Sequence, residues 1–201
     1  MAATATPYGL RAVNLIGGIP FAGSTRQISI ASGYGTNIFN GSVVSIAATG
    51  TIEIVTTNGD NSTPFPAGTI GVFVGCRYTD PSTSQLTFNQ RWPTGTVASD
   101  AMAYIVDDPN AVFQVQADGA VTQADLGQNT YFGAVQSTST GSTINGNSTS
   151  AATATTAVTS GMAFRIVDFV DGPDSVIGDA FTDLLVKFNP DSHSYLNKTG
   201  I

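Results

Sequence analysis

The sequence predicts an all-β fold, a β-sandwich or jelly-roll-like body, on the basis of three observations. Glycine (22 residues) and proline (9 residues) interrupt the chain at short, fairly even intervals. The segments between them are rich in β-branched residues, and several alternate apolar and polar side chains as strands do. No segment of ten or more residues shows the apolar period of a helix, and Glu, common on surface helices, occurs only as Glu53.

Eight segments are expected to form strands. Two of them are joined by a short loop containing Thr49 and Gly50, which suits a hairpin, and Gly71 and Gly75 permit a bulge or bend inside the longest one. Asp108-Pro109-Asn110 combines turn-forming residues between two apolar runs and predicts a turn. The expected strands are 26–31, 42–47, 51–56, 69–78, 101–107, 111–117, 162–170 and 183–188.

Three regions differ from this pattern, and helix signals are few. Residues 1–25 lack strand alternation and are expected to form an extended N-terminal arm beside a body of residues 26–201. Residues 137–160 contain 14 Ser or Thr and no charge. They predict a long loop or a β-hairpin laid on a neighbouring molecule, and length and composition favour mobility. Residues 189–201 are a polar tail, and Thr122 with Asp125 caps one short helical turn.

The charge balance excludes some partners. Lys and Arg number 7 against 14 Asp and Glu, which gives a formal net charge of −7 and no basic stripe for nucleic acid. No apolar run approaches the ~18 residues of a membrane span, and the start of the chain lacks a secretory signal. Only 10% of residues are charged, and a neutral polar surface is cheap to bury against a protein partner.

Few residues are candidates for chemistry, and we expect no enzyme, cofactor or metal. The single Cys76 excludes an intramolecular disulfide and, in an apolar strand, is expected to be buried and inert. The single His193 lies in a polar tail and is interpreted as a solvated or interface histidine. Asp168, Asp171 and Asp174 are interpreted as turn and edge residues, with a calcium site as the alternative because calcium prefers several convergent oxygen ligands.

Arg91 and Trp92 are the remaining candidates for a contact surface. Trp92 is the only tryptophan of the chain, and Trp and Arg are enriched at interface hot spots. A single tryptophan is equally consistent with a place in the hydrophobic core. Both interpretations stay open at the level of sequence.

Four stretches of the chain resemble the head structural proteins of tailed bacteriophages, in particular the decoration or cement proteins on the outside of the capsid. The resemblance runs from the N-terminal motif to the C-terminal tail, and the Ser/Thr-rich stretch is its vaguest part. The stretches are Pro7-Tyr8-Gly9-Leu10-Arg11, VDDPNAVFQVQADG at 106–119, VDFVDGP at 167–173, and GDAFTDLLVKFNPDSHSY at 178–195.

The resemblance implies a β-sandwich, jelly-roll-like body without catalytic residues that forms trimers on the capsid exterior. Its partners would be the major capsid protein and two further copies of itself, and its place the virion after synthesis in the host cytoplasm. We expect the N-terminal arm to be the main capsid contact, since an extended segment can cover a long joint between subunits. The alternative is an ordinary first strand packed within the domain. The expected contact residues are Pro7, Tyr8, Leu10, Arg11, Phe21 and Arg26.

Other classes of function remain as alternatives. A carbohydrate- or receptor-binding β module would share the fold class, and Tyr78, Phe88 and Trp92 are the nearest approach to the aromatic cluster it needs. A tail-tube subunit would also be β-rich. A major capsid protein is disfavoured because the chain is short and shows no long helix.

Overall fold

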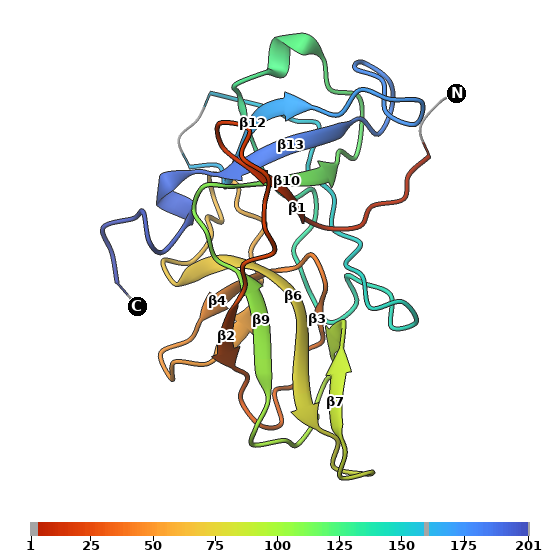
Figure 1. The fold of residues 1–201 in the computed structure, drawn as a ribbon. Helices are drawn as coiled ribbons and strands as arrows, with labels where there is room; N and C mark the ends of the chain where they lie inside the picture. Colours follow the sequence, from red (N-terminus) through yellow and green to blue (C-terminus); the bar gives the residue numbers. More distant parts are fainter. Residues whose placement is uncertain (1–3, 159–160, 201) are drawn as a thin grey trace.

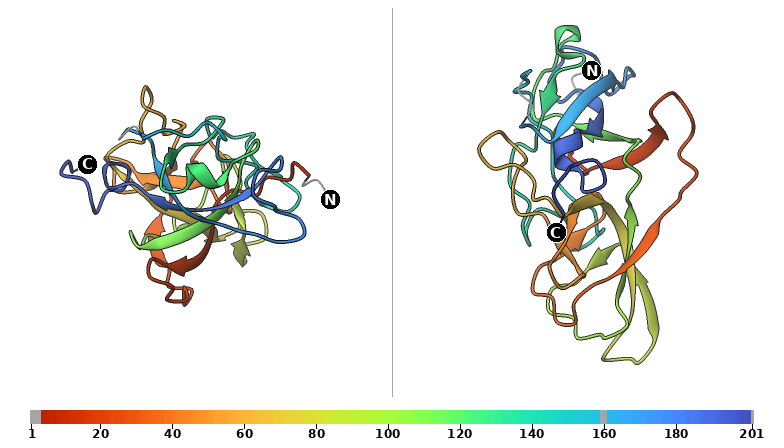
Figure 2. Two further views of the ribbon diagram at one scale, coloured as in Figure 1. Left: turned by 90° about the horizontal axis from the view of Figure 1, so that it is seen from above. Right: turned by 90° about the vertical axis from the view of Figure 1, so that its left-hand side faces the viewer.

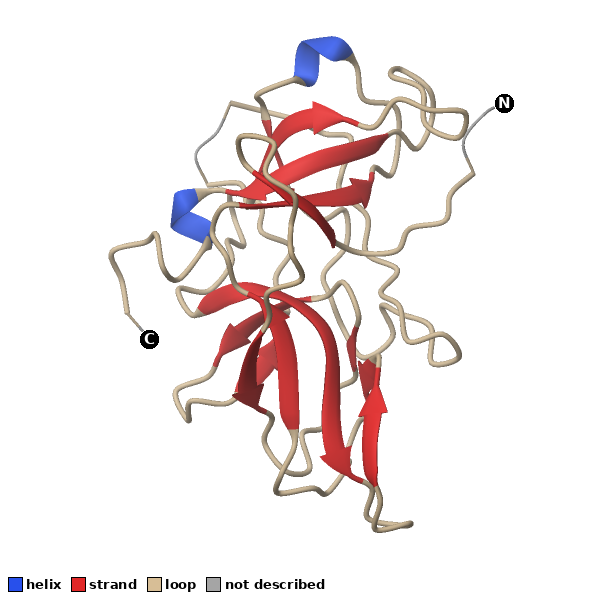
Figure 3. Ribbon diagram, viewed as in Figure 1, coloured by secondary structure: helices blue, strands red, loops and turns tan. Residues whose placement is uncertain are grey.

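The strands of this chain form antiparallel sheets, and the predicted all-β class is confirmed (Figure 3). The structure is a computed structural model that describes residues 4–158 and 161–200. Among these residues, no helix has the length and apolar character needed to cross a membrane.

One sheet has five strands in the order β1-β10-β13-β12-β11 and lies in the upper part of Figure 1. All pairings within it are antiparallel. Its strands are β1 (Arg11–Leu15), β10 (Ala111–Gln116), β11 (Asn129–Thr130), β12 (Phe164–Phe169) and β13 (Asp183–Phe188).

The second sheet has six strands and lies in the lower part of Figure 1, with the order β2-β9-β6-β4-β5 and β7 paired to β6. The short pair β3–β8 lies beside it. The strands are β2 (Arg26–Ser29), β3 (Ile38–Phe39), β4 (Val43–Ile46), β5 (Ile52–Ile54), β6 (Thr69–Thr79), β7 (Leu86–Asn89), β8 (Arg91–Trp92) and β9 (Met102–Val106).

Two short 3-10 helices complete the described elements: η1 (Gln123–Asp125) and η2 (Pro190–Ser192). The predicted cap is confirmed, because the backbone N–H of Thr122 donates to the Asp125 carboxylate at 2.8 Å. Gly127 follows in the left-handed region (φ +82°), as expected for the end of the turn.

The hydrophobic core consists of two clusters. The larger one fills the space between the sheets and contains Val43, Val72 and Val106 from one sheet with Val115 and Leu184 from the other. The smaller one packs the opposite face of the six-stranded sheet against β3 and β8. The chain crosses between the sheets at residues 16–25, from β1 to β2, and again at residues 107–110, where the predicted turn joins β9 to β10.

Two local predictions for the six-stranded sheet are also confirmed. The hairpin of β4 and β5 is antiparallel, with Val44 opposite Ile54. The pairing of β6 with β9 shifts register between Phe73 and Gly75, which is the predicted irregularity.

The predicted boundary between an arm and a body is wrong for residues 4–15. Residues 11–15 are β1, which pairs with β10, and Leu10 is buried in the larger cluster. The backbone N–H of Thr6 donates to Gln116 Oε1 at 2.8 Å, and Gln116 Nε2 donates to Thr4 O at 3.1 Å, which fixes residues 4–6 to the body. Only the connection of residues 16–25 runs outside both sheets, along one side of the molecule (Figure 2).

The Ser/Thr-rich stretch forms a long loop over its described residues 137–158, as one of the two predicted alternatives had it, but this loop is packed on the body of its own chain. Asn147 bridges to Asn40 and Ala152 to Ala117. The backbone N–H of Ala154 donates to Asp118 Oδ1 at 2.7 Å. Small residues allow this close packing, as Gly141 lies directly against the Phe39 ring. Residues 159–160 of the predicted loop lie outside the described residues.

Candidate functional site

His193 is buried within the chain, so its interpretation as a solvated or interface residue is wrong. The C-terminal segment docks on the body, because the backbone N–H of Ser194 donates to Thr69 O at 2.7 Å. The imidazole packs between the rings of Phe188 and Tyr195, at centroid distances of 5.6 and 5.3 Å. Burial lowers the pKa of His193 below its usual value, so the neutral ring is favoured.

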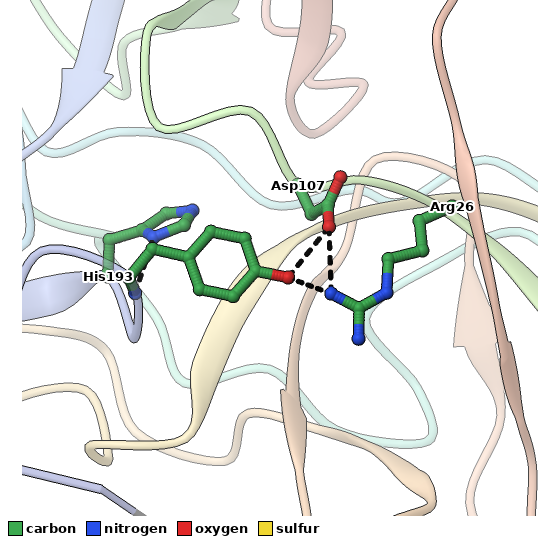
Figure 4. A network of polar contacts seen from close by, with 4 residues as sticks. Arg26, Asp107 and His193 are labelled. Atoms are coloured by element: carbon green, nitrogen blue, oxygen red, sulfur yellow. Dashed lines mark hydrogen bonds and ion pairs between the residues drawn. The ribbon is translucent and has the colours of Figure 1, made fainter.

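Next to this histidine, a polar network ties three segments together (Figure 4). Arg26 at the start of β2 forms an ion pair with Asp107 at 3.3 Å, and it also donates to the Tyr195 hydroxyl. The Tyr195 hydroxyl donates to the same Asp107 carboxylate at 2.8 Å. Burial and this carboxylate raise the pKa of Tyr195 to about 12. Arg26, predicted to contact a capsid, is therefore engaged within the chain.

Cys76 lies in β6, and the late aspartates form no metal-binding group in the described part of the chain. Cys76 is buried as predicted, and burial raises the pKa of its thiol to about 12, which disfavours the reactive thiolate. Within residues 4–158 and 161–200, no group of three or more His, Cys, Asp or Glu is placed to hold a metal ion.

Trp92 belongs to the core, which decides between its two interpretations. Its side chain is completely buried, and its ring lies edge-on to Tyr78 at 5.4 Å. Its indole N–H donates to Tyr34 O at 3.2 Å. The neighbouring Arg91 is half-buried and donates to Asn37 Oδ1 at 3.3 Å. Because Tyr78 and Trp92 are both buried, the aromatic cluster considered for a carbohydrate-binding module is not on the surface.

Three predicted contact residues line one groove, which we name the N-terminal groove. Pro7, Tyr8 and Arg11 form one wall, and the turn of residues 142–149 forms the other. The groove has a volume of about 370 Å³. Its lining residues are Thr6, Pro7, Tyr8, Arg11, Ser142, Asn145, Asn147, Ser148 and Thr149.

The two walls are held together by close backbone packing at Gly9. The N–H of Gly9 donates to Ser150 O at 3.1 Å, and that of Leu10 donates to Gly41 O at 2.9 Å. Gly9 has φ +74°, and a Cβ there would lie 2.7 Å from both Gly41 O and the Ser148 Cβ. Glycine is therefore required between the tyrosine and the leucine of the motif.

The remaining predicted contact residues lie elsewhere. Leu10 is buried in the core and cannot contact a partner. Phe21 is half-buried against the larger core cluster. The connection around it exposes Ile16 and Ile19 instead.

A second exposed surface lies on the six-stranded sheet at strand β7, and we name it the Phe88 face. Phe88 on β7 is 66% exposed and Leu86 is 53% exposed. Arg77 on β6 lies opposite Phe88 on β7 and opposite Met102 on β9. Beside Phe88, a shallow hollow of about 250 Å³ is lined by Val74, Gly75, Cys76, Phe88, Asn89, Gln90 and Tyr104.

Comparisons with protein families, with curated proteins and with solved structures gave no match. The sequence indicated one wall of the N-terminal groove, but the second wall comes from a stretch whose composition carries no positional signal. The sequence does contain a pattern that indicates the Phe88 face. Leu86 and Phe88 are two residues apart, so in a strand both side chains lie on the same face.

Proposed function

We propose that this chain is a structural protein of the virion, a decoration protein that binds the outside of a tailed-phage head. It acts without catalysis, as a homotrimer that stabilises joints between major capsid subunits. Three copies engage three capsid sites at once, so modest contacts combine into firm attachment through effective concentration.

One observation carries the proposal: the four stretches that resemble decoration proteins come together in the fold. The stretch at 7–11 leads into β1, the stretch at 106–119 contains β10, and the stretch at 178–195 contains β13. The stretch at 167–173 contains the end of β12. These strands are consecutive neighbours in the five-stranded sheet. Segments far apart in sequence thus build one structural unit, as a family likeness requires.

The surface also suits attachment to protein. It is poor in charge, and several large apolar side chains are exposed, including Ile16, Ile19 and Phe88. Burial of such groups against a partner lowers the free energy of the complex, by roughly 25 cal/mol per Å² of apolar surface buried.

Binding to expanded heads that lack decoration tests the proposal directly. Purified protein added to such heads should bind in many copies over the outer surface and raise the temperature at which the heads release DNA. Binding confined to tails, or no binding to heads at saturating protein, would refute the decoration role. Binding to tails alone would favour the tail-tube alternative.

We propose that the Phe88 face is the contact between copies in the trimer. Each copy carries a net charge of −7, so copies must meet at a surface with few carboxylates. The residues around Phe88 fit this need, because the hollow beside it contains no acidic side chain.

Substitution of Phe88 by Ser is expected to shift the purified protein from trimer to monomer in a mass measurement in solution. The exposed side chain contributes little to the fold, so the free energy of unfolding should change by less than about 1 kcal/mol. Val158, which is 90% exposed in the connection before β12, provides a matched control, and Val158→Ser should leave the trimer intact. A trimer that survives Phe88→Ser would place the contact elsewhere.

A further inference from the structure

Arg11 is an exposed cation that forms no ion pair with a carboxylate of the described residues. Over residues 4–158 and 161–200, the only ion pair is that of Arg26 with Asp107. The Arg11 guanidinium carbon instead lies 4.3 Å from the centroid of the Tyr8 ring. Stacking on an aromatic face restrains the guanidinium and leaves the N–H groups at its edge free for a planar acceptor.

The Tyr8 ring that supports Arg11 is itself fixed. Its hydroxyl oxygen is buried and makes no hydrogen bond of standard geometry. Burial and the nearby Asp183 carboxylate raise the pKa of Tyr8 well above its usual value, so the phenol is neutral. Asp183 Oδ2 in turn accepts a hydrogen bond from Gln114 Nε2 at 3.0 Å. The hydroxyl end of Tyr8 is thus buried close to Asp183, and the Arg11 guanidinium stacks over the ring.

The rest of the N-terminal groove offers neutral polar groups and no competing acid. Its lining includes hydroxyl and amide side chains from Ser142, Asn145 and Asn147, and no Asp or Glu. In a chain with 14 acidic residues, Arg11 is the only charged side chain in the lining of this groove, and the Asp183 carboxylate near Tyr8 is not part of that lining. Charge complementarity therefore favours an acidic occupant.

The outer wall adds an apolar contact. Residues 142–147 form a tight turn, in which Ser142 N donates to Asn147 O at 2.9 Å and Gly146 N donates to Ser142 O at 2.8 Å. Ile144 projects from this turn and is 97% exposed. An apolar side chain thus stands on the same turn that supplies the groove's neutral polar wall.

We infer that the N-terminal groove binds an extended acidic segment of the major capsid protein, with a carboxylate on the edge of the Arg11 guanidinium and an apolar side chain against Ile144. This inference rests on the proposed function for the identity of the partner. The chemistry of the segment, a carboxylate and an apolar side chain, follows from Arg11 and Ile144.

The first test uses the isolated protein and a defined probe, so it does not depend on capsids. The blocked peptide acetyl-Gly-Glu-Val-Glu-Val-Gly-amide is titrated into labelled protein and followed by NMR. We expect chemical shift changes at Arg11 and residues 142–149, and none with the peptide in which Gln replaces both Glu. Absence of shifts, or equal shifts with the Gln peptide, would overturn the inference.

The second test measures affinity for undecorated heads. Arg11→Gln should lower the affinity at least about tenfold, because a charge-assisted hydrogen bond is lost at each copy. Arg11→Lys keeps the charge but cannot make the bidentate hydrogen bonds of a guanidinium, so its affinity should lie between those of Arg11→Gln and wild type. Lys198→Gln removes an exposed cation outside the groove and should change the affinity less than about twofold.

The outcomes separate the inference from the proposed function. If heads bind wild type and Arg11→Gln equally well, the decoration role stands and the acidic segment is wrong. If the acidic peptide binds at Arg11 but no heads bind, the groove chemistry stands and the decoration role fails. If Arg11→Gln dissociates the trimer, the occupant is a second copy of this chain, and the capsid assignment of the groove is overturned.

Discussion

Substitution of Gly71 by Ala is expected to destabilise the protein by about 4 kcal/mol or more, or to prevent folding. Gly71 lies in β6 with φ +152°, and a Cβ there would be 2.0 Å from the carbonyl oxygen of Val106. That oxygen belongs to the backbone of β9, which pairs with β6 at Val72 opposite Val106. The clash is therefore with a backbone held by the sheet and cannot be relieved by a rotamer change.

Gly50 provides the matched control. It also has a positive φ (+77°), in the turn between β4 and β5, but no atom lies within 4 Å of the position of its Cβ. Gly50→Ala therefore carries only the conformational strain, about 1–2 kcal/mol. Urea unfolding followed by circular dichroism measures both variants. If both variants lost the same free energy of unfolding, the close approach of the added Cβ to Val106 O would not be the cause of destabilisation at Gly71.

The parts of the fold that could be predicted are those determined by residues close together in the sequence. The hairpin of β4 and β5 combines two alternating segments with a glycine-containing turn, and both signals lie within a few residues of each other. The same is true of the Thr122–Asp125 cap. In each case the determining hydrogen bonds are local, such as Ala47 N to Thr51 O at 2.8 Å.

The parts of the fold that were predicted wrongly are determined by contacts between residues distant in sequence. β1 has weak alternation of its own and becomes a strand by pairing with β10, where Arg11 lies opposite Gln114. The burial of His193 depends on the docking of Ser194 against Thr69. Composition indicates neither event, because a polar tail and an Ala/Gly-rich terminus are equally compatible with solvent.

One wall of the N-terminal groove could be predicted from the sequence, and the other could not. Pro7, Tyr8 and Arg11 stand close together in one motif, so a resemblance to a family was enough to select them. The opposing wall from Ser142 to Thr149 reaches them only through the packing of Gly9 against Gly41 and the 148–150 backbone. Deletion of residues 2–20 would remove β1 and Leu10 as well as the groove, so the Arg11 substitutions are the sharper test of the contact.

Trp92→Ala is expected to reduce the free energy of unfolding by about 3–5 kcal/mol, a large part of the stability of an ordinary domain. The side chain is completely buried in the smaller core cluster, and the substitution leaves a cavity against Tyr78. It also leaves Tyr34 O without its hydrogen bond from the indole. Thermal unfolding followed by far-ultraviolet circular dichroism measures the loss without depending on the only tryptophan as a fluorophore.

A core role and an interface role for Trp92 predict different results for the milder variant Trp92→Phe. In the core, it lowers the unfolding midpoint and leaves the oligomer mass of the folded fraction unchanged. At an interface, it would leave the midpoint unchanged and weaken binding. Arg91→Ala serves as the comparison, since this half-buried residue contributes one hydrogen bond to Asn37 and should cost about 1 kcal/mol. An unchanged midpoint for Trp92→Ala would contradict the packing of β8 against the six-stranded sheet, and with it the support for β7 and the Phe88 face.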